Sequence, residues 1–133
     1  ILENSARTAQ DAAKALDCNV GAIVKSLLFR TGDDFILCLV AGDKRCSLNK
    51  LKKLKDKKDI LMASPKEVKT QTGYTIGGVS PIGHINNIEI IIDKSLKRFN
   101  QLFAAAGHPN CVFKINFINI QKITNGEVEN IIE

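Results

Sequence analysis

A lysine inside an apolar segment is the residue of this sequence with the clearest chemical potential. Lys25 lies in the run 23–29, whose β-branched and other apolar side chains predict a buried strand. Lysine is almost never fully buried without a partner, because removing an ammonium group from water is costly. Two interpretations stay open from this residue alone. Either the side chain reaches solvent from a half-exposed strand, or it is directed at an anionic or electron-rich group.

The glycine-rich segment 77–84 is the second candidate. Adjacent Gly77 and Gly78 permit a sharp turn that presents backbone N–H groups, and Pro81 stiffens the loop. Its spacing is not that of a Walker loop, of a G-x-G-x-x-G dinucleotide site or of a G-x-S-x-G nucleophile elbow. The segment therefore predicts either a tight connection or a ligand cradle built from backbone amides.

The histidines and cysteines give no metal-binding pattern. His84 and His108 each follow a glycine, and neither has cysteine or acidic residues at ligand spacing, so we expect no metal and no cofactor. His108 is either structural or a substrate contact. The four cysteines form no C-x-x-C pair, which predicts reduced thiols, with Cys38 a small core residue. No nucleophile and base can be paired from their spacing.

Positive charge gathers in residues 44–58. This segment holds eight basic residues and one acidic residue, Asp56, whereas the whole chain has 19 basic and 14 acidic residues. Such a patch favours a nucleic acid partner, although a solvated helix face has the same composition. The residues expected to contact a nucleic acid backbone are Lys44, Arg45, Lys50, Lys52, Lys53 and Lys55.

Length and composition predict one globular domain over residues 1–133. Of the 133 residues, 44% are hydrophobic and 25% charged, as in ordinary soluble proteins. No apolar run is long enough to span a bilayer, and no signal peptide is recognisable, so we expect a cytoplasmic protein without a membrane partner. Because the chain starts at Ile1 rather than Met, we expect the native protein to begin earlier.

The order of the elements predicts a mixed sheet. A helix from Thr8 is followed by the strand of Lys25, a turn at 31–34 and a strand at 35–41, which together suggest a hairpin. The later helices expected are at 47–55, 64–73 and 93–107, where Ser47, Ser64 and Asp93 are the expected caps, and at 119–125. The later strands expected are at 88–92, 111–117 and 127–132. The irregular alternation indicates an α/β fold of the α+β mixed kind, with helices packed around the sheet.

Several segments in fixed order resemble the YbaK family, also described as the prolyl-tRNA synthetase editing-domain or EbsC-like family. The segments are TAQDAA at 8–13, IVKSL at 23–27, VAGD at 40–43, TGYTIGGVSP at 72–81, Asp93 and AGHPN at 106–110. The resemblance covers nearly the whole chain. It implies a bent, partly barrel-like mixed sheet without a metal, and hydrolysis of the ester between a wrong amino acid and its tRNA.

The resemblance also implies roles for particular residues. The functional lysine of the family falls on Lys25, and the backbone of the glycine loop is expected to stabilise the reacting carbonyl. The expected catalytic residues are Lys25, Gly78, Val79 and Ser80. The expected substrate-binding residues are Gly77, Pro81, His84, Gly107, His108 and Pro109.

The absence of synthetase sequence implies the freestanding members of the family, which edit in trans. The expected substrate is a small amino acid, such as alanine or cysteine, on tRNA for proline or a similar tRNA. A synthetase in transient complex is an expected partner. Two alternatives remain: a non-catalytic module that binds tRNA or a nucleotide in the same pocket, and a hydrolase of a small acyl or nucleotide ester.

Overall fold

A mixed five-stranded sheet is the centre of the fold. The structure, a computed structural model, describes residues 8–76, 78–108 and 111–133. The strands of the sheet lie in the order β3-β1-β2-β4-β7, with β1, β2 and β3 antiparallel and β2, β4 and β7 parallel. Their bounds are Val24–Thr31 for β1, Asp34–Ala41 for β2, Ile60–Met62 for β3, Glu89–Asp93 for β4 and Glu127–Glu129 for β7.

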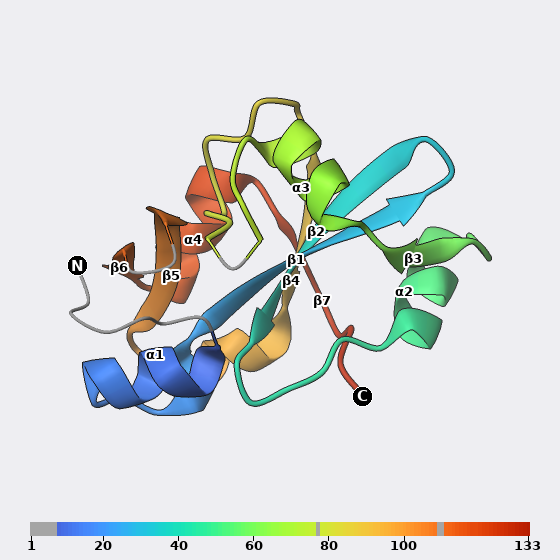
Figure 1. Ribbon diagram of the computed structural model, residues 1–133. Helices are drawn as coiled ribbons and strands as arrows, with labels where there is room; N and C mark the ends of the chain where they lie inside the picture. The colour runs from blue at the N-terminus through green and yellow to red at the C-terminus, as the bar shows by residue number, and fades with distance from the viewer. Residues whose placement is uncertain (1–7, 77, 109–110) are drawn as a thin grey trace.

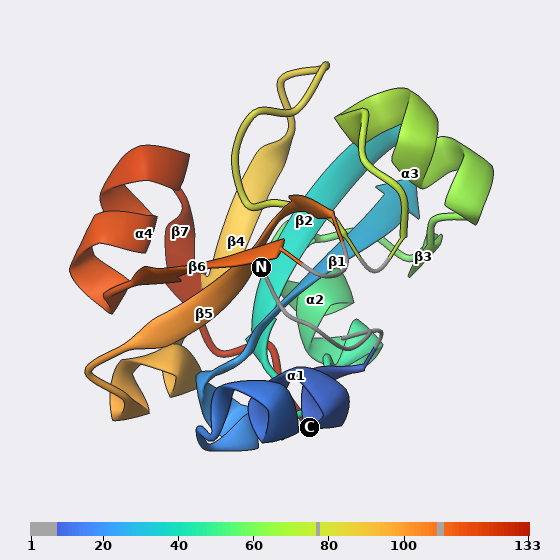
Figure 2. The same cartoon turned by 60° about the vertical axis from the view of Figure 1, so that its left-hand side comes forward.

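A separate antiparallel ribbon crosses one face of this sheet (Figure 2). It consists of β5 (Leu102–His108) and β6 (Cys111–Ile115). The sheet stays open and is not a closed barrel, so the expected mixed α/β class is confirmed while the barrel-like part is limited to this crossing ribbon.

The helices begin where side-chain caps satisfy their first N–H groups. Thr8, Ser47 and Asn116 accept from backbone amides at the starts of α1, α2 and α4, and Ser64 forms a capping box with Glu67 at α3. The helices are α1 (Ala9–Leu16), α2 (Leu48–Lys55), α3 (Pro65–Thr72) and α4 (Phe117–Thr124), with 3₁₀ turns η1 (Val20–Ala22) and η2 (Lys94–Arg98). In Figure 1, α1 and α2 lie at opposite ends of the molecule.

The two faces of the sheet carry separate apolar clusters. Alternate residues of β1 and β2 point to opposite faces, so Leu28 and Leu39 join one cluster while Phe29 and Cys38 join the other. The first cluster is covered by α3, α4 and the β5–β6 ribbon. The second is covered by α2 and the C-terminal segment. Both faces of β2 are therefore buried, which explains its continuous apolar sequence.

The long helix expected at 93–107 is wrong. Asp93 does cap a helical turn, but that turn is the short η2, and the chain continues as the strand β5. The error has a physical cause, because β5 is buried on both sides: Leu102 and Ala104 join the cluster against the sheet, and Phe103 packs under α1. A strand buried on both faces shows no alternation, and its apolar spacing then resembles that of a helix.

The other expected elements are present, and β3 was missed. The hairpin of β1 and β2 has the expected turn, with Thr31 opposite Asp34. Strand β3 has only three residues, of which Leu61 and Met62 are exposed, so it shows no apolar pattern. Within the described residues, no helix is both long and apolar enough to cross a membrane.

Candidate functional site

A cavity lies along the open edge of β1. Strand β3 pairs with β1 only from Phe29 to Thr31, and no other strand among the described residues extends this pairing toward Val24. The cavity beside the edge has a volume of about 380 Å³. Its walls come from the start of α1, from β1, from the loop after α3 and from the β5–β6 ribbon. Its apolar lining includes Ala12, Ile23, Val79, Phe103, Ala105 and Val112.

Lys25 lines this cavity, and its ammonium group is held by a backbone carbonyl. Its Nζ donates a hydrogen bond to the carbonyl oxygen of Lys44 at 2.5 Å, and the side chain is half-buried. Strand alternation places Lys25 on the face of the sheet that α2 covers. An ammonium group has three donors, so a single bond to Lys44 leaves donors for a ligand.

The surroundings of Lys25 lower its pKa below the ordinary lysine value. Burial is the main cause and the Arg45 cation adds to it, whereas Asp43 and Cys46 act in the opposite direction. Both effects disfavour the charged form of a group that lines a cavity. An anionic or electron-rich ligand would compensate for this penalty.

Of the glycine loop, Val79 reaches the cavity wall. Val79 is 5% exposed and lines the cavity, whereas Ser80 and Pro81 are buried behind it and are not part of the wall. The Gly78 amide donates to the carbonyl oxygen of Thr75 at 2.9 Å. The expectation that the Gly78 amide is an available donor is therefore wrong for this conformation, because the loop uses that amide to close its own turn.

His84 braces the loop and does not line the cavity. Its Nε2 lies 2.6 Å from the carbonyl oxygen of Ser80, and its ring meets the ring of Tyr74 edge-on at 6.0 Å. Tyr74 also donates from its hydroxyl to the carbonyl oxygen of Ile82 at 2.8 Å. The structure thus gives His84 a structural position instead of the expected contact with substrate.

Gly107 has a conformational reason to be glycine. Its φ of +96° is unfavourable for other residues, and a Cβ atom there would lie 3.0 Å from the ring of Tyr74. Like the loop, this end of β5 therefore packs on Tyr74 rather than forming the cavity wall. Gly77 and Pro109 lie outside the described residues, and so does the side chain of His108.

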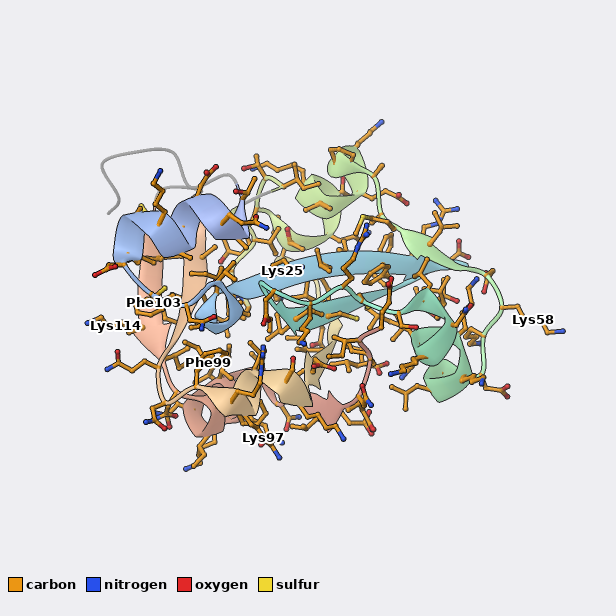
Figure 3. All side chains as sticks on the ribbon, turned by 90° about the horizontal axis from the view of Figure 1, so that it is seen from below. Lys25, Lys58, Lys97, Phe99, Phe103 and Lys114 are labelled. Atoms are coloured by element: carbon orange, nitrogen blue, oxygen red, sulfur yellow. The ribbon has the colours of Figure 1, made fainter. Side chains whose placement is uncertain are left out.

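The basic segment starts at the cavity and runs away from it. Lys44 supplies the acceptor of Lys25, and Figure 3 shows Lys58 at the far end of the molecule from Lys25. Two of the lysines expected to contact nucleic acid have intramolecular partners. Lys50 donates to the carbonyl oxygen of Ile132 at 2.6 Å, and Lys55 forms an ion pair with Glu89.

Some residues of the cavity carry no signal in the sequence. Ala105 and Val112 are opposite each other on β5 and β6, and they reach the cavity only because the ribbon crosses the sheet. Ser26 also lines the cavity, and its buried hydroxyl has no hydrogen-bond partner within the described part of the chain. Ser26 belongs to the segment 23–27 that the sequence singled out, whereas Ala105 and Val112 belong to none of the segments singled out there.

All four cysteines are free thiols, and Cys38 is fully buried as expected. The described ranges contain no group of three or more histidine, cysteine, aspartate or glutamate side chains that could hold a metal ion.

Comparison with known proteins gives this site a context. The model of the aminoacyl-tRNA editing domain matches residues 3–123. The chain is 40% identical over 114 residues to the uncharacterised protein YwhH of Bacillus subtilis, a match that covers 85% of this chain and 72% of YwhH. It is 31% identical over 116 residues to the proline–tRNA ligase of Thermosipho melanesiensis, a match that covers 87% of this chain but 20% of the ligase. The chain therefore spans only about a fifth of that ligase.

Solved structures agree with these sequence relatives. A crystal structure described as a candidate trans-editing enzyme for prolyl tRNA synthetase superposes with a TM-score of 0.94 at 36% identity, covering 99% of this chain and 83% of the other. The crystal structure of a hypothetical protein superposes with a TM-score of 0.92 at 28% identity, covering 100% of this chain and 89% of the other.

Fold and cavity together define a mixed α/β domain with a mainly apolar cavity that is lined in part by a lysine. The chain belongs to the aminoacyl-tRNA editing domain family, of the YbaK type. This membership supports an editing function on aminoacyl-tRNA.

Proposed function

We propose that this protein hydrolyses, in trans, the ester bond of a mischarged aminoacyl-tRNA that carries a small amino acid, such as alanine or cysteine on tRNA for proline. The protein would act in the cytoplasm, where tRNA is charged, and would meet a synthetase only transiently. The observation that carries the proposal is the cavity at the open edge of β1, which Lys25 lines together with several apolar side chains.

The size and lining of the cavity support a small substrate side chain. A volume of about 380 Å³ is near the lower end for ligand sites, which span roughly 300 to 1,000 Å³. Much of the lining is apolar, with Ile23, Val79 and Phe103 among it. A small uncharged side chain fits such walls, whereas a charged one would lose its hydration without a partner.

The proposed reaction adds water to the ester carbonyl. The water oxygen attacks the carbonyl carbon, negative charge develops on the carbonyl oxygen, and the ribose oxygen then leaves with a proton to give free amino acid and tRNA. Lys25 would bind the terminal phosphate or the ester region with the donors that Lys44 does not use. The backbone amide of Val79, the residue of the glycine loop that lines the cavity, is the proposed partner of the developing oxyanion.

Among the described residues that line the cavity, no side chain is an evident general base. We propose that a free hydroxyl of the terminal ribose assists the attacking water. With a cysteinyl substrate, the thiol could instead attack its own carbonyl, which forms a cyclic thioester, breaks the ester bond and passes the thiol proton to the leaving ribose oxygen. The proposed reaction uses no metal.

The direct test is deacylation of a panel of tRNAs charged with Ala, Cys, Ser or Pro. We expect the wild type to hydrolyse at least one mischarged tRNA for proline. Lys25→Ala should lower kcat/KM by about a hundredfold or more, the order found when one charge-stabilising donor is removed. Lys122→Ala is the matched control, because it removes the same charge from an exposed position on α4 that neither lines the cavity nor belongs to the basic segment.

The panel also separates the alternatives. Binding of tRNA without turnover would indicate a non-catalytic module, and turnover of small esters alone would indicate a different hydrolase. Full activity of Lys25→Ala on a hydrolysed tRNA would remove Lys25 from the mechanism.

A further inference from the structure

The turn between β2 and α2 joins the cavity to the acceptor of Lys25. Gly42 lines the cavity, and two residues later the carbonyl oxygen of Lys44 receives the Lys25 hydrogen bond. The Gly42 amide donates to the carbonyl oxygen of Ile23 at 2.8 Å, and a Cβ atom at Gly42 would lie 2.4 Å from the carbonyl oxygen of Val20. The turn is therefore packed closely against the start of β1, and a shift of the turn would move the acceptor of Lys25.

This turn is held from outside by Arg98. The guanidinium group of Arg98 binds Asp43 with both ends of its fork, Nη2 to Oδ1 at 2.7 Å and Nη1 to Oδ2 at 3.0 Å. Such bidentate pairs fix orientation as well as distance. The third donor of Arg98, Nε, donates to the carbonyl oxygen of Ser95 at 2.8 Å, and the group lies over the ring of Phe99 at 5.0 Å. These contacts hold the guanidinium group of Arg98 in one position beside η2.

The same pair contributes to the charge around Lys25. The hydrogen bond from Arg98 lowers the pKa of Asp43 and keeps it anionic, and Asp43 in turn acts to raise the pKa of Lys25 against burial and Arg45. Asp43 therefore has both a mechanical and an electrostatic connection to the lysine of the cavity.

We propose that Arg98 and Asp43 form a positioning clamp for Lys25. The clamp fixes the turn at residues 41–44, so that the Lys44 carbonyl keeps the ammonium group in one position while the Lys25 side chain lines the cavity. The reaction that this position serves is the one proposed above. Neither Arg98 nor Asp43 touches the substrate, and both act through Lys25.

Deacylation kinetics of Arg98→Gln, Asp43→Asn and the double variant test the clamp. Small displacements of reacting groups lower rates strongly, so each single variant should lose about ten- to hundredfold in kcat/KM, mainly in kcat. Because both residues act as one unit, the loss of kcat/KM in the double variant should be no larger than the loss in the less active of the two single variants. Arg98→Lys keeps the charge without the fork and should be intermediate.

Arg30→Gln is the matched control. It breaks the ion pair in which Nη1 of Arg30 lies 2.8 Å from Oε2 of Glu67. The two side chains of this pair are 45% and 25% exposed, close to the 40% and 28% of the Arg98 and Asp43 side chains. Surface ion pairs contribute little to stability, so the control and the clamp variants should lose similarly small amounts of the free energy of unfolding. The control should keep kcat/KM within about twofold of the wild type.

The pH profile distinguishes positioning from general weakening. The charged groups that act on Lys25 are Arg45, Asp43 and Cys46. Asp43→Asn removes the carboxylate among them, so the alkaline limb of the profile should shift to lower pH. Arg98→Gln leaves that carboxylate in place and should not shift the limb downward, although it lowers the rate.

A second measurement keeps the clamp testable if the proposed function fails. Reductive methylation with ¹³C-formaldehyde labels lysine side chains for NMR, and Lys25→Arg assigns the Lys25 signal. Both Arg98→Gln and Asp43→Asn should change the chemical shift of the Lys25 signal, and Arg30→Gln should not. An unchanged Lys25 signal in both clamp variants, or additive losses in the kinetics, would overturn the clamp, whereas absence of deacylation by the wild type would overturn only the proposed reaction.

Discussion

Lys25 combines an unfavourable environment with a position that its neighbours maintain. Burial and Arg45 lower its pKa, and a backbone carbonyl holds its ammonium group in place. Residues of this kind reduce the stability of the folded state and are typical of functional sites. The sequence identified Lys25 because an apolar run made its charge conspicuous. It could not identify the Lys44 carbonyl, because a backbone acceptor leaves no trace in residue types.

The lowered pKa of Lys25 predicts a pH dependence of stability. The unfolded chain binds a proton at this lysine more tightly than the folded chain does, so the wild type gains stability as the pH rises from below the folded pKa to the ordinary lysine range. Lys25→Met lacks this titration. We therefore expect the free energy of unfolding of the wild type, relative to Lys25→Met, to increase between pH 7 and pH 10. Urea unfolding of both proteins at the two pH values measures it, and a constant or falling difference would contradict the assignment.

Capping signals predicted the starts of the helices better than periodicity predicted their extent. Ser47 and Ser64 were identified as caps from sequence, and both bind the expected amides. Asp93 was also identified as a cap, but the helix expected after it is a 3₁₀ turn followed by β5. Caps depend on neighbouring residues alone, whereas the strand β5 exists because its two faces meet α1 and the main sheet, which lie far away in the sequence.

The carboxylate of Asp93 joins β4 to the C-terminal segment, and its hydrogen bonds predict how much this connection contributes to stability. Its carboxylate is fully buried and accepts from the amides of Ser95 at 2.9 Å and Ile131 at 2.8 Å, one with each oxygen. Asp93→Ala leaves both buried amides without an acceptor and should lower the free energy of unfolding by about 2–4 kcal/mol. Asp93→Asn keeps one acceptor oxygen and should lose less. Urea unfolding gives both values. Equal losses in the two variants would show that the hydrogen bond retained by Asp93→Asn does not contribute to stability.

The arrangement of charge over the molecule connects the cavity to a larger surface. The basic segment begins at Lys44, next to Lys25, and extends along α2 toward Lys58 at the far end (Figure 3). A nucleic acid whose end enters the cavity would therefore lie along α2. The sequence predicted the positive charge of this segment, but not which of its lysines already have partners, because Ile132 and Glu89 are distant in sequence from Lys50 and Lys55.

These internal contacts divide the basic segment into two groups with different expected effects on tRNA binding. Lys52 and Lys53 have no such contact among the described residues, whereas Lys50 and Lys55 do. The logarithm of the tRNA binding constant should fall linearly with the logarithm of the salt concentration. Each lost phosphate contact should make the slope of this line less steep by about 0.7 to 0.9. The double variant Lys52→Gln/Lys53→Gln should therefore flatten the slope more than the matched double variant Lys50→Gln/Lys55→Gln.

Filter binding or fluorescence titration of tRNA between low and physiological salt measures the slopes. The comparison holds the charge constant, because both double variants remove two lysines from the same helix. Equal slopes in the two variants would mean that only the total charge of α2 matters to tRNA and that its internal contacts do not. A slope that neither variant changes would place the tRNA elsewhere and would leave the basic segment as a solvated helix face.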